Sequence, residues 1–116
     1  MCSETQRVSD IFIVDNMFSI TITCKDKKEA EKIAGILLDK KLIACANMFP
    51  VESHYLWKGK KELSDEYIVI GKTMKGKFAA IEKEVKKAHS YDVPFISMHE
   101  EKATDEVEQW LQKELK

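Results

Sequence analysis

The chain has few cysteines, almost no net charge and no apolar run long enough to cross a bilayer. Its three cysteines, Cys2, Cys24 and Cys45, match no zinc or redox spacing, so we interpret them as free thiols in a reducing cytosol. The net charge of −1, with basic residues spread along the sequence, argues against a nucleic-acid surface. The first ten residues lack the basic start and apolar stretch of a signal peptide. These absences predict a cytoplasmic protein with neither a membrane nor a nucleic-acid partner.

The length of 116 residues suits one domain with one hydrophobic core. We expect residues 1–15 to form a partly ordered N-terminal tail and residues 16–116 to form the domain. The tail contains one apolar run, Ile11 to Val14, which either extends the first strand or makes contacts of its own.

The first strand and the first helix have clear patterns. Residues 17–24 alternate between apolar and polar, which is typical of a half-buried strand. Asp26 is a helix N-cap, and Glu29 stands three residues later as in a capping box. Helical spacing then predicts one buried stripe, made by Ala30, Ile33, Ala34, Leu37 and Leu38.

The second half of the chain predicts two further helices and a short strand. A helix should begin within residues 73–77, bury Phe78, Ile81 and Val85, and end at 89–92 ahead of Pro94. Residues 93–98 predict a strand and residues 100–103 a polar loop. Thr104 then caps a last helix with four buried side chains, those of Val107, Trp110, Leu111 and Leu115.

The element order is therefore β-α-β-β-α-β with an added C-terminal helix. Two split βαβ halves of this kind form an α+β, ferredoxin-like sandwich, with both helices on one face of an antiparallel sheet.

The stretch Leu42 to Thr73 predicts a long hairpin between the second and third strands, with a tight break at Lys58-Gly59. An arm of about sixteen residues, at roughly 3.3 Å each, spans roughly 50 Å. A compact domain of this size has a radius of gyration of only about 13 Å. The hairpin must therefore bend sharply or pack on another subunit. Pro50, which cannot donate to the ladder, marks an edge or a bend and is compatible with both outcomes.

The end of this hairpin is apolar. Tyr55, Leu56 and Trp57 are too apolar for a free tip, so we predict that they are buried against a second copy of the chain. Stacking of Tyr55 and Trp57 on a ligand ring is the alternative. Tyr91 either lines a cleft between subunits or satisfies a buried backbone group.

Few side chains of the sequence are candidates for metal binding or catalysis. His89 could bind a soft or borderline metal through a ring nitrogen, with the Cys24 thiolate as its partner; alternatively it is a histidine at a helix C-terminus. His54 and His99 are interpreted as solvated side chains, and so are the carboxylates of a third group, Glu62, Asp65 and Glu66. No nucleophile stands with a base, so we do not predict an enzyme.

Four blocks occur in register: KLIACANMFP, SHYLWKGK, VIGKT and HSYDVPFI. Together they resemble the CutA family of divalent-cation-tolerance proteins, over roughly residues 18–115. The resemblance implies a homotrimer of ferredoxin-like subunits joined through long hairpins, similar to PII signalling proteins. It also implies binding of a divalent metal ion, copper in particular, with no established catalytic activity. A PII-like adaptor, binding a protein partner or small ligand at subunit clefts, is the alternative function.

The resemblance implies a metal site only in part. The family's proposed ligands are a cysteine of the first strand, a histidine of the H-x-Y-x-x-P block and an acidic residue after its proline. Here His89 matches the histidine and Cys24 lies near the end of the first strand. Ala88 precedes the histidine, so no His-His pair exists, and Phe95 occupies the acidic position. Ser90 replaces the usual proline of the block.

Overall fold

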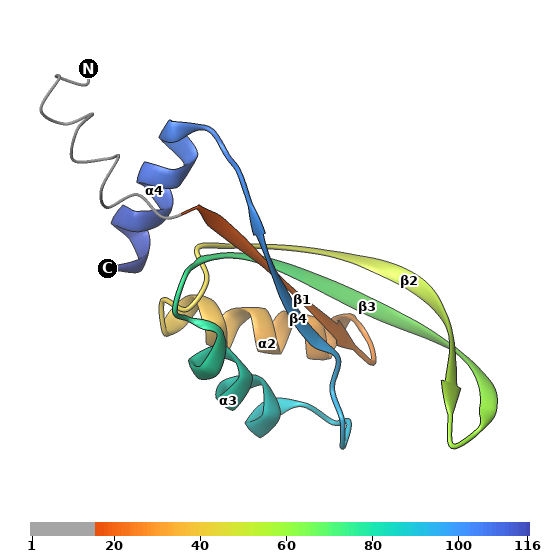
Figure 1. Cartoon of the computed structure of the whole chain (residues 1–116). Helices are drawn as coiled ribbons and strands as arrows, with labels where there is room; N and C mark the ends of the chain where they lie inside the picture. The colour runs from red at the N-terminus through yellow and green to blue at the C-terminus, as the bar shows by residue number, and fades with distance from the viewer. Residues whose placement is uncertain (1–15) are drawn as a thin grey trace, which may run out of the picture.

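The computed structural model describes residues 16–116 and contains one antiparallel sheet. Its seven elements are β1 (Met17–Cys24), α2 (Lys27–Asp39), β2 (Cys45–Trp57), β3 (Lys60–Met74), α3 (Phe78–Ala88), β4 (Ile96–Glu101) and α4 (Asp105–Leu115). The strand order is β2-β3-β1-β4, so β2 and β4 are the edges. Helices α2 and α3 lie on the same face of the sheet, and α4 lies beside the start of β1 (Figure 1). The predicted ferredoxin-like fold with an added C-terminal helix is confirmed.

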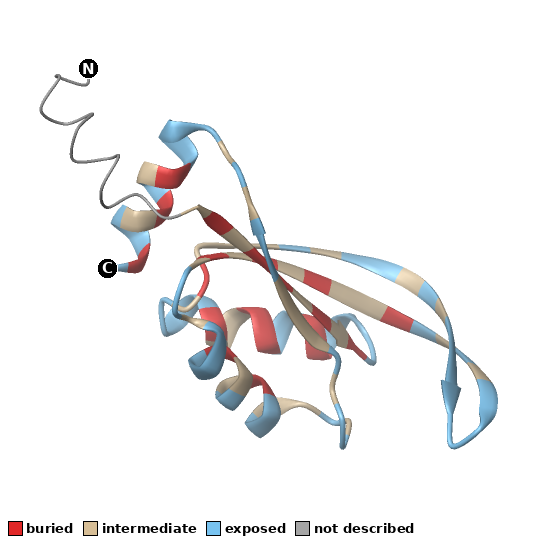
Figure 2. Cartoon of the chain, viewed as in Figure 1, coloured by how far each residue is buried: buried red, intermediate tan, exposed pale blue. Residues whose placement is uncertain are grey.

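The core lies between the sheet and the helices α2 and α3 (Figure 2). Ile22 of β1 and Val69 of β3 stand opposite each other in the ladder and are both fully buried. They pack with the buried stripes of the two helices, which comprise Ala30, Ile33, Ala34 and Leu37 of α2 and Ile81 and Val85 of α3. A second, smaller cluster joins Met17 to Leu111 and Leu115 of α4.

Side-chain caps fix the starts of two helices. The Asp26 carboxylate accepts the backbone N–H of Glu29 at 2.9 Å, and Thr104 Oγ1 accepts the N–H of Val107 at 3.3 Å. Glu29 Oε1 in turn accepts the N–H of Lys25, one residue before the cap. The predicted caps of α2 and α4 are therefore confirmed, with the box at α2 closing one residue further back than usual.

The hairpin of β2 and β3 extends well beyond the core, as predicted (Figure 1). Lys58 and Gly59 have φ angles of 50° and 80°, which suit a two-residue turn between twisted strands. Only residues 67–74 of β3 pair with β1, so residues 60–66 pair with β2 alone. The described residues consequently measure 57 × 25 × 22 Å, with a radius of gyration of 16.4 Å. Pro50 lies in the edge strand β2 and pairs with Tyr67, so no ladder donor is missed inside the sheet.

Three predicted boundaries are wrong. Helix α3 begins at Phe78 and not within residues 73–77, because β3 continues to Met74, which pairs with Met17 of β1. A turn containing Gly76, whose φ is 89°, then separates strand from helix. Strand β4 begins at Ile96 and includes Glu100, which lies opposite Phe18, so the strand is shifted towards the predicted polar loop.

Four predicted core residues are partly exposed. Leu38 is 42% exposed, Phe78 and Val107 are 37% exposed, and Trp110 is 41% exposed. Helix α4 instead buries Glu108 beside Leu111 and Leu115, and this carboxylate is held by an ion pair to Lys102 and by the N–H of Ala103. The predicted tail and its apolar run lie outside the described residues.

Candidate functional site

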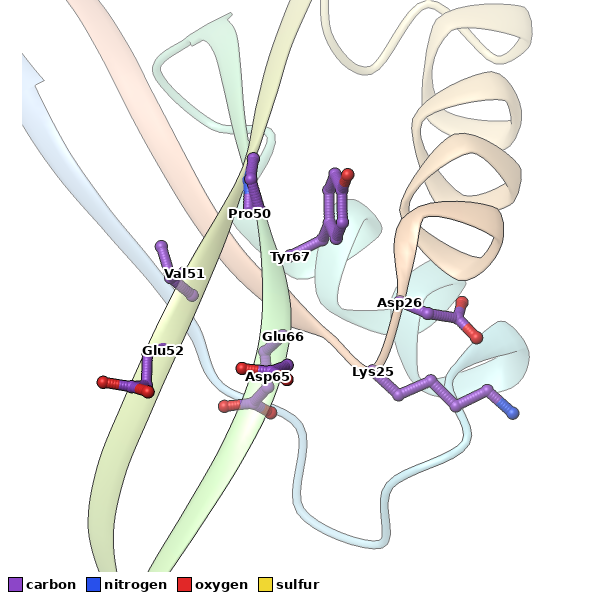
Figure 3. Close-up of a pocket in the computed structure, with 8 residues that line it drawn as sticks. All are labelled: Lys25, Asp26, Pro50, Val51, Glu52, Asp65, Glu66 and Tyr67. Atoms are coloured by element: carbon purple, nitrogen blue, oxygen red, sulfur yellow. The ribbon is translucent and has the colours of Figure 1, made fainter.

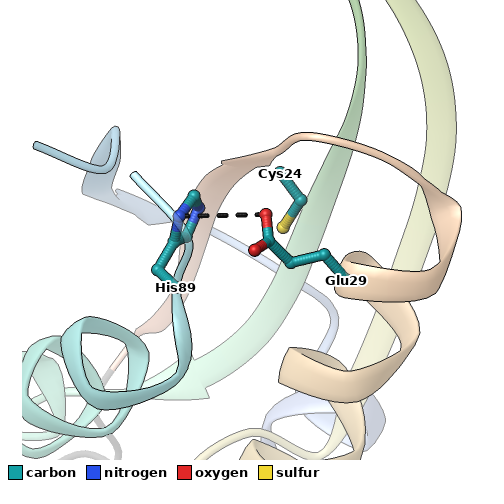
Figure 4. A group of neighbouring side chains, drawn as sticks. All are labelled: Cys24, Glu29 and His89. Atoms are coloured by element: carbon teal, nitrogen blue, oxygen red, sulfur yellow. Dashed lines mark ion pairs between the residues drawn. The ribbon is translucent and has the colours of Figure 1, made fainter. Parts of the chain in front are cut away.

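Three segments that are distant in sequence bring Cys24, Glu29 and His89 together (Figure 4). Cys24 is the last residue of β1, and Glu29 lies in the first turn of α2. His89 is the C-cap of α3, where its N–H donates to the carbonyl of Val85 at 2.8 Å. One donor atom from each of the three side chains lies within 4.8 Å of the others, and we call these residues the donor cluster. The predicted pairing of His89 with Cys24 thus acquires a third member.

The donor cluster is buried and its histidine is tightly held. The side chains of His89 and Glu29 are almost fully buried, and Nδ1 lies 3.8 Å from Glu29 Oε1. Nδ1 accepts the backbone N–H of Tyr91 at 3.0 Å, so Nε2 carries the proton of the neutral ring. That Nε2–H donates to the carbonyl of Thr23 at 2.7 Å.

Glu29 is an ionised carboxylate within this buried cluster. Burial by itself would raise its pKa, but backbone N–H donors outweigh that effect and lower the pKa below the ordinary value. The N–H groups of Lys25 and Ser90 each lie 2.9 Å from one carboxylate oxygen.

Cys24 is a neutral thiol in the same cluster. Burial, followed by the negative charges of Glu29, Asp26 and Glu66, raises its pKa from 9.0 to about 12. It is fully buried, so we do not expect the reactivity of a catalytic cysteine.

The donor types of the cluster fit a thiophilic or borderline divalent cation, because sulfur, nitrogen and carboxylate oxygen are the ligands that copper(II) and zinc(II) accept. Ligand atoms about 2.0–2.3 Å from a shared ion lie closer together than 4.8 Å, so a small inward movement is needed. A cation on Nδ1 must also displace the N–H of Tyr91, and the thiol of Cys24 must lose its proton. The residues therefore fit the ion, but binding requires a small movement, the loss of one hydrogen bond and the deprotonation of Cys24.

A second feature lies at the base of the hairpin. A cavity of about 430 Å³ opens there, lined by Lys25, Asp26, Pro50, Val51, Glu52, Asp65, Glu66 and Tyr67 (Figure 3). Glu66 is only 6% exposed and accepts the hydroxyl of Tyr91 at 2.6 Å. Burial and this hydrogen bond raise the pKa of Tyr91. Tyr91 thus donates to a side-chain carboxylate of its own chain and not to the backbone group that we gave as one alternative, while its place in a cleft between subunits stays a prediction.

The other predicted site residues lie away from the donor cluster. Tyr55, Leu56 and Trp57 stand at the hairpin tip and are 43%, 72% and 48% exposed in the single chain. His54 pairs with Glu52 at 3.2 Å, and its side chain is mostly exposed, as expected of a solvated histidine.

Sequence reasoning missed two carboxylates. Glu29 was interpreted only as a capping residue, and Glu66 only as a solvated acid of the hairpin. Glu29 reaches Ser90, 61 positions away, and Glu66 reaches Tyr91, 25 positions away. The one available signal was the capping pattern itself, because it places Glu29 at the end of the strand that carries Cys24.

These features define a ferredoxin-like subunit with a projecting hairpin and a buried S/N/O donor cluster. The model of one family, described as CutA1 divalent ion tolerance protein, matches residues 18–114. The chain belongs to this family. It is 49% identical to the divalent-cation tolerance protein CutA of Archaeoglobus fulgidus over 77 residues, which cover 66% of this chain and 76% of that protein. It is 34% identical to the CutA of Pyrococcus horikoshii over 101 residues, 86% of this chain and 99% of that protein.

Solved structures agree with this assignment. The structure described as the periplasmic divalent cation tolerance protein CutA from Archaeoglobus fulgidus has a TM-score of 0.84 and 40% identity, and the match covers 86% of this chain and 99% of that one. CutA1 from Oryza sativa has a TM-score of 0.83 and 30% identity, with 89% and 96% covered. Within residues 16–116, no helix is both long and apolar enough to cross a membrane.

Proposed function

We propose that this CutA-family chain is a non-enzymatic homotrimer that binds a divalent metal ion, copper in particular, at the donor cluster. The observation that carries the proposal is the convergence of Cys24, Glu29 and His89 within 4.8 Å. The family's description, divalent ion tolerance, supports the same class of ligand. Copper(II) is favoured over zinc(II) because nitrogen and sulfur sites generally bind it more tightly.

Calorimetric titration with Cu²⁺ and Zn²⁺ tests the metal site. The parent chain should bind one ion per subunit, and His89→Ala should lower the affinity by at least about tenfold, the effect of losing one of three ligands. A double variant, His54→Ala with His99→Ala, removes the exposed histidines and is the matched control. Circular dichroism establishes that His89→Ala is folded, and Glu29→Gln offers a second way to remove a ligand. Equal affinity in the parent, His89→Ala and Glu29→Gln would refute this site.

The homotrimer is supported by surfaces that a single chain leaves uncovered. The edge strand β2 has thirteen residues with one unpaired side, and such edges are normally covered or blunted. Leu56 and Leu63, on opposite arms of the hairpin, are 72% and 63% exposed. Large apolar side chains gathered on a projecting arm are typical of an interface between subunits.

Sedimentation in dilute buffer tests the assembly. The mass should be about three times the chain mass of 13.4 kDa. Trp57→Ala should weaken assembly by about 2–4 kcal/mol per interface, the usual effect of truncating a buried interface aromatic. Val93→Ala removes an exposed apolar side chain outside the hairpin and should leave the mass unchanged. A stable monomer, or a trimer insensitive to Trp57→Ala, would contradict the proposed interface.

We also propose a cytoplasmic location. The two cysteines of the described residues, Cys24 and Cys45, are free thiols, which suits a reducing compartment. Cell fractionation tests this, and recovery of the chain from an exported fraction would contradict it.

A further inference from the structure

A groove on the far side of the molecule from the hairpin tip leaves apolar side chains exposed. It lies between the end of α2 and the helix α4, has a volume of about 310 Å³, and is lined by Leu38, Lys41, Ile43, Ala44, Trp110, Glu114 and Leu115. Leu38 and Trp110, one from each helix, are 42% and 41% exposed. This groove is separate from the donor cluster and from the hairpin. Two large side chains facing a hollow of this size leave room for a short apolar segment.

The chain itself supplies such a segment. Residues 1–15 lie outside the described part, and within them Ile11, Phe12, Ile13 and Val14 form an uninterrupted apolar run. This run also lies outside residues 18–114, which the family model matches. It is therefore an addition to the part of the chain that the family model matches.

The described chain begins close to the groove. The described chain starts at Asn16, and the next residue, Met17, packs against Leu111 and Leu115 of α4. Leu115 also lines the groove. The apolar run thus ends only three positions before a residue that already contacts the groove's own lining. A segment tethered so closely has a high effective concentration, so it competes well against a free partner.

The charged residues of the lining are Lys41 and Glu114, which carry opposite charges, so the apolar side chains decide what the groove accepts. We propose that residues 11–14 pack into the groove between α2 and α4, covering Leu38 and Trp110, and so form an N-terminal clasp that holds the C-terminal helix to the domain.

Tryptophan fluorescence tests the clasp in the full chain. Trp57→Phe leaves Trp110 as the single tryptophan and serves as the background. Deleting residues 1–15, or replacing Phe12→Asp, should shift the Trp110 emission to the red and increase its quenching by acrylamide. The melting temperature should fall by at least about 4 °C, the shift that a modest loss of burial causes in a small domain. Deleting only residues 1–9 is the matched control and should leave the Trp110 emission, its quenching by acrylamide and the melting temperature unchanged.

The same experiment can overturn the proposal. Equal quenching of Trp110 in the full chain, in Phe12→Asp and in the deletion of residues 1–15 would show that the run does not cover the groove. Quenching that rises on dilution of the full chain to the same extent as in Phe12→Asp would show that a second copy covers it instead. If the longer deletion does not fold, Phe12→Asp decides the question alone.

Discussion

Raising the pH above 9 should destabilise the fold through the thiol of Cys24. This thiol has a pKa of about 12 in the folded chain, against 9.0 for a free thiol. Above pH 9 the unfolded chain loses the thiol proton while the folded chain keeps it, so the unfolded state binds fewer protons. This contribution is therefore complete below pH 9 and is lost as the pH rises towards 12. The slope is about 1.4 kcal/mol per pH unit, so about 2 kcal/mol is lost by pH 10.5.

Urea unfolding followed by circular dichroism measures this loss, at fixed protein concentration with chelator and reductant present. Cys24→Ala removes the titrating thiol and leaves every other ionisable group of the chain in place, so the comparison isolates Cys24. The difference in unfolding free energy between parent and Cys24→Ala should therefore shrink by about 2 kcal/mol between pH 9 and about 10.5. Cys45→Ala removes a half-exposed thiol and should keep the parent's slope. A parent–variant difference that stays constant over this range would refute the assigned burial and charge environment of Cys24.

Two further predictions concern stability at neutral pH. Tyr91→Phe removes the hydroxyl that donates to the buried Glu66 carboxylate at 2.6 Å, and should cost about 1.5–3 kcal/mol in urea unfolding, as hydrogen bonds to charged groups do; no change would mean that water satisfies the carboxylate. Gly71→Ala would place a Cβ 2.9 Å from Cγ2 of Ile20, so we expect a loss of about 1–3 kcal/mol in thermal or urea unfolding. Gly35→Ala, where a Cβ meets nothing within 4 Å, is its control and should be neutral or stabilising.

Local sequence patterns predicted the helices and strands well where contacts between residues close in sequence determine them. Asp26 and Thr104 cap helices because a side-chain oxygen directly before the helix accepts an N–H only three residues later and needs no distant partner. The hairpin overhang followed from strand length alone, and Lys58 with Gly59 fixed its turn. The start of α3 was wrong because the pairing of Met74 with Met17 extends β3, and a pairing partner across the sheet has no local signal.

Tertiary contacts account for the remaining misses. The predicted buried face of α4 contained Val107 and Trp110, yet the helix is rotated so that Glu108 is buried. Periodicity assigns a carboxylate to solvent, and it contains no information about Lys102 and the N–H of Ala103, which approach this carboxylate in the fold. Glu29 was missed as a cluster member for a similar reason, because its contact to Ser90 joins the first turn of α2 to the loop after α3, which are far apart in sequence.

The arrangement around His89 would link the proposed cation binding to the hairpin. Nδ1 of His89 accepts the backbone N–H of Tyr91. The hydroxyl of Tyr91 donates to Glu66 of β3, and Glu66 pairs with Val51 of the edge strand β2. A cation on Nδ1 must displace Tyr91, so the loop that contacts the hairpin base has to shift with it.

Because all side-chain hydrogen-bonding atoms of His89 and Glu29 have partners without a cation, the domain should fold in the presence of a chelator. Binding must also release the Cys24 proton, so cation affinity should rise up to about tenfold per pH unit near neutrality, and Cys24→Ala should flatten that rise in calorimetric titrations.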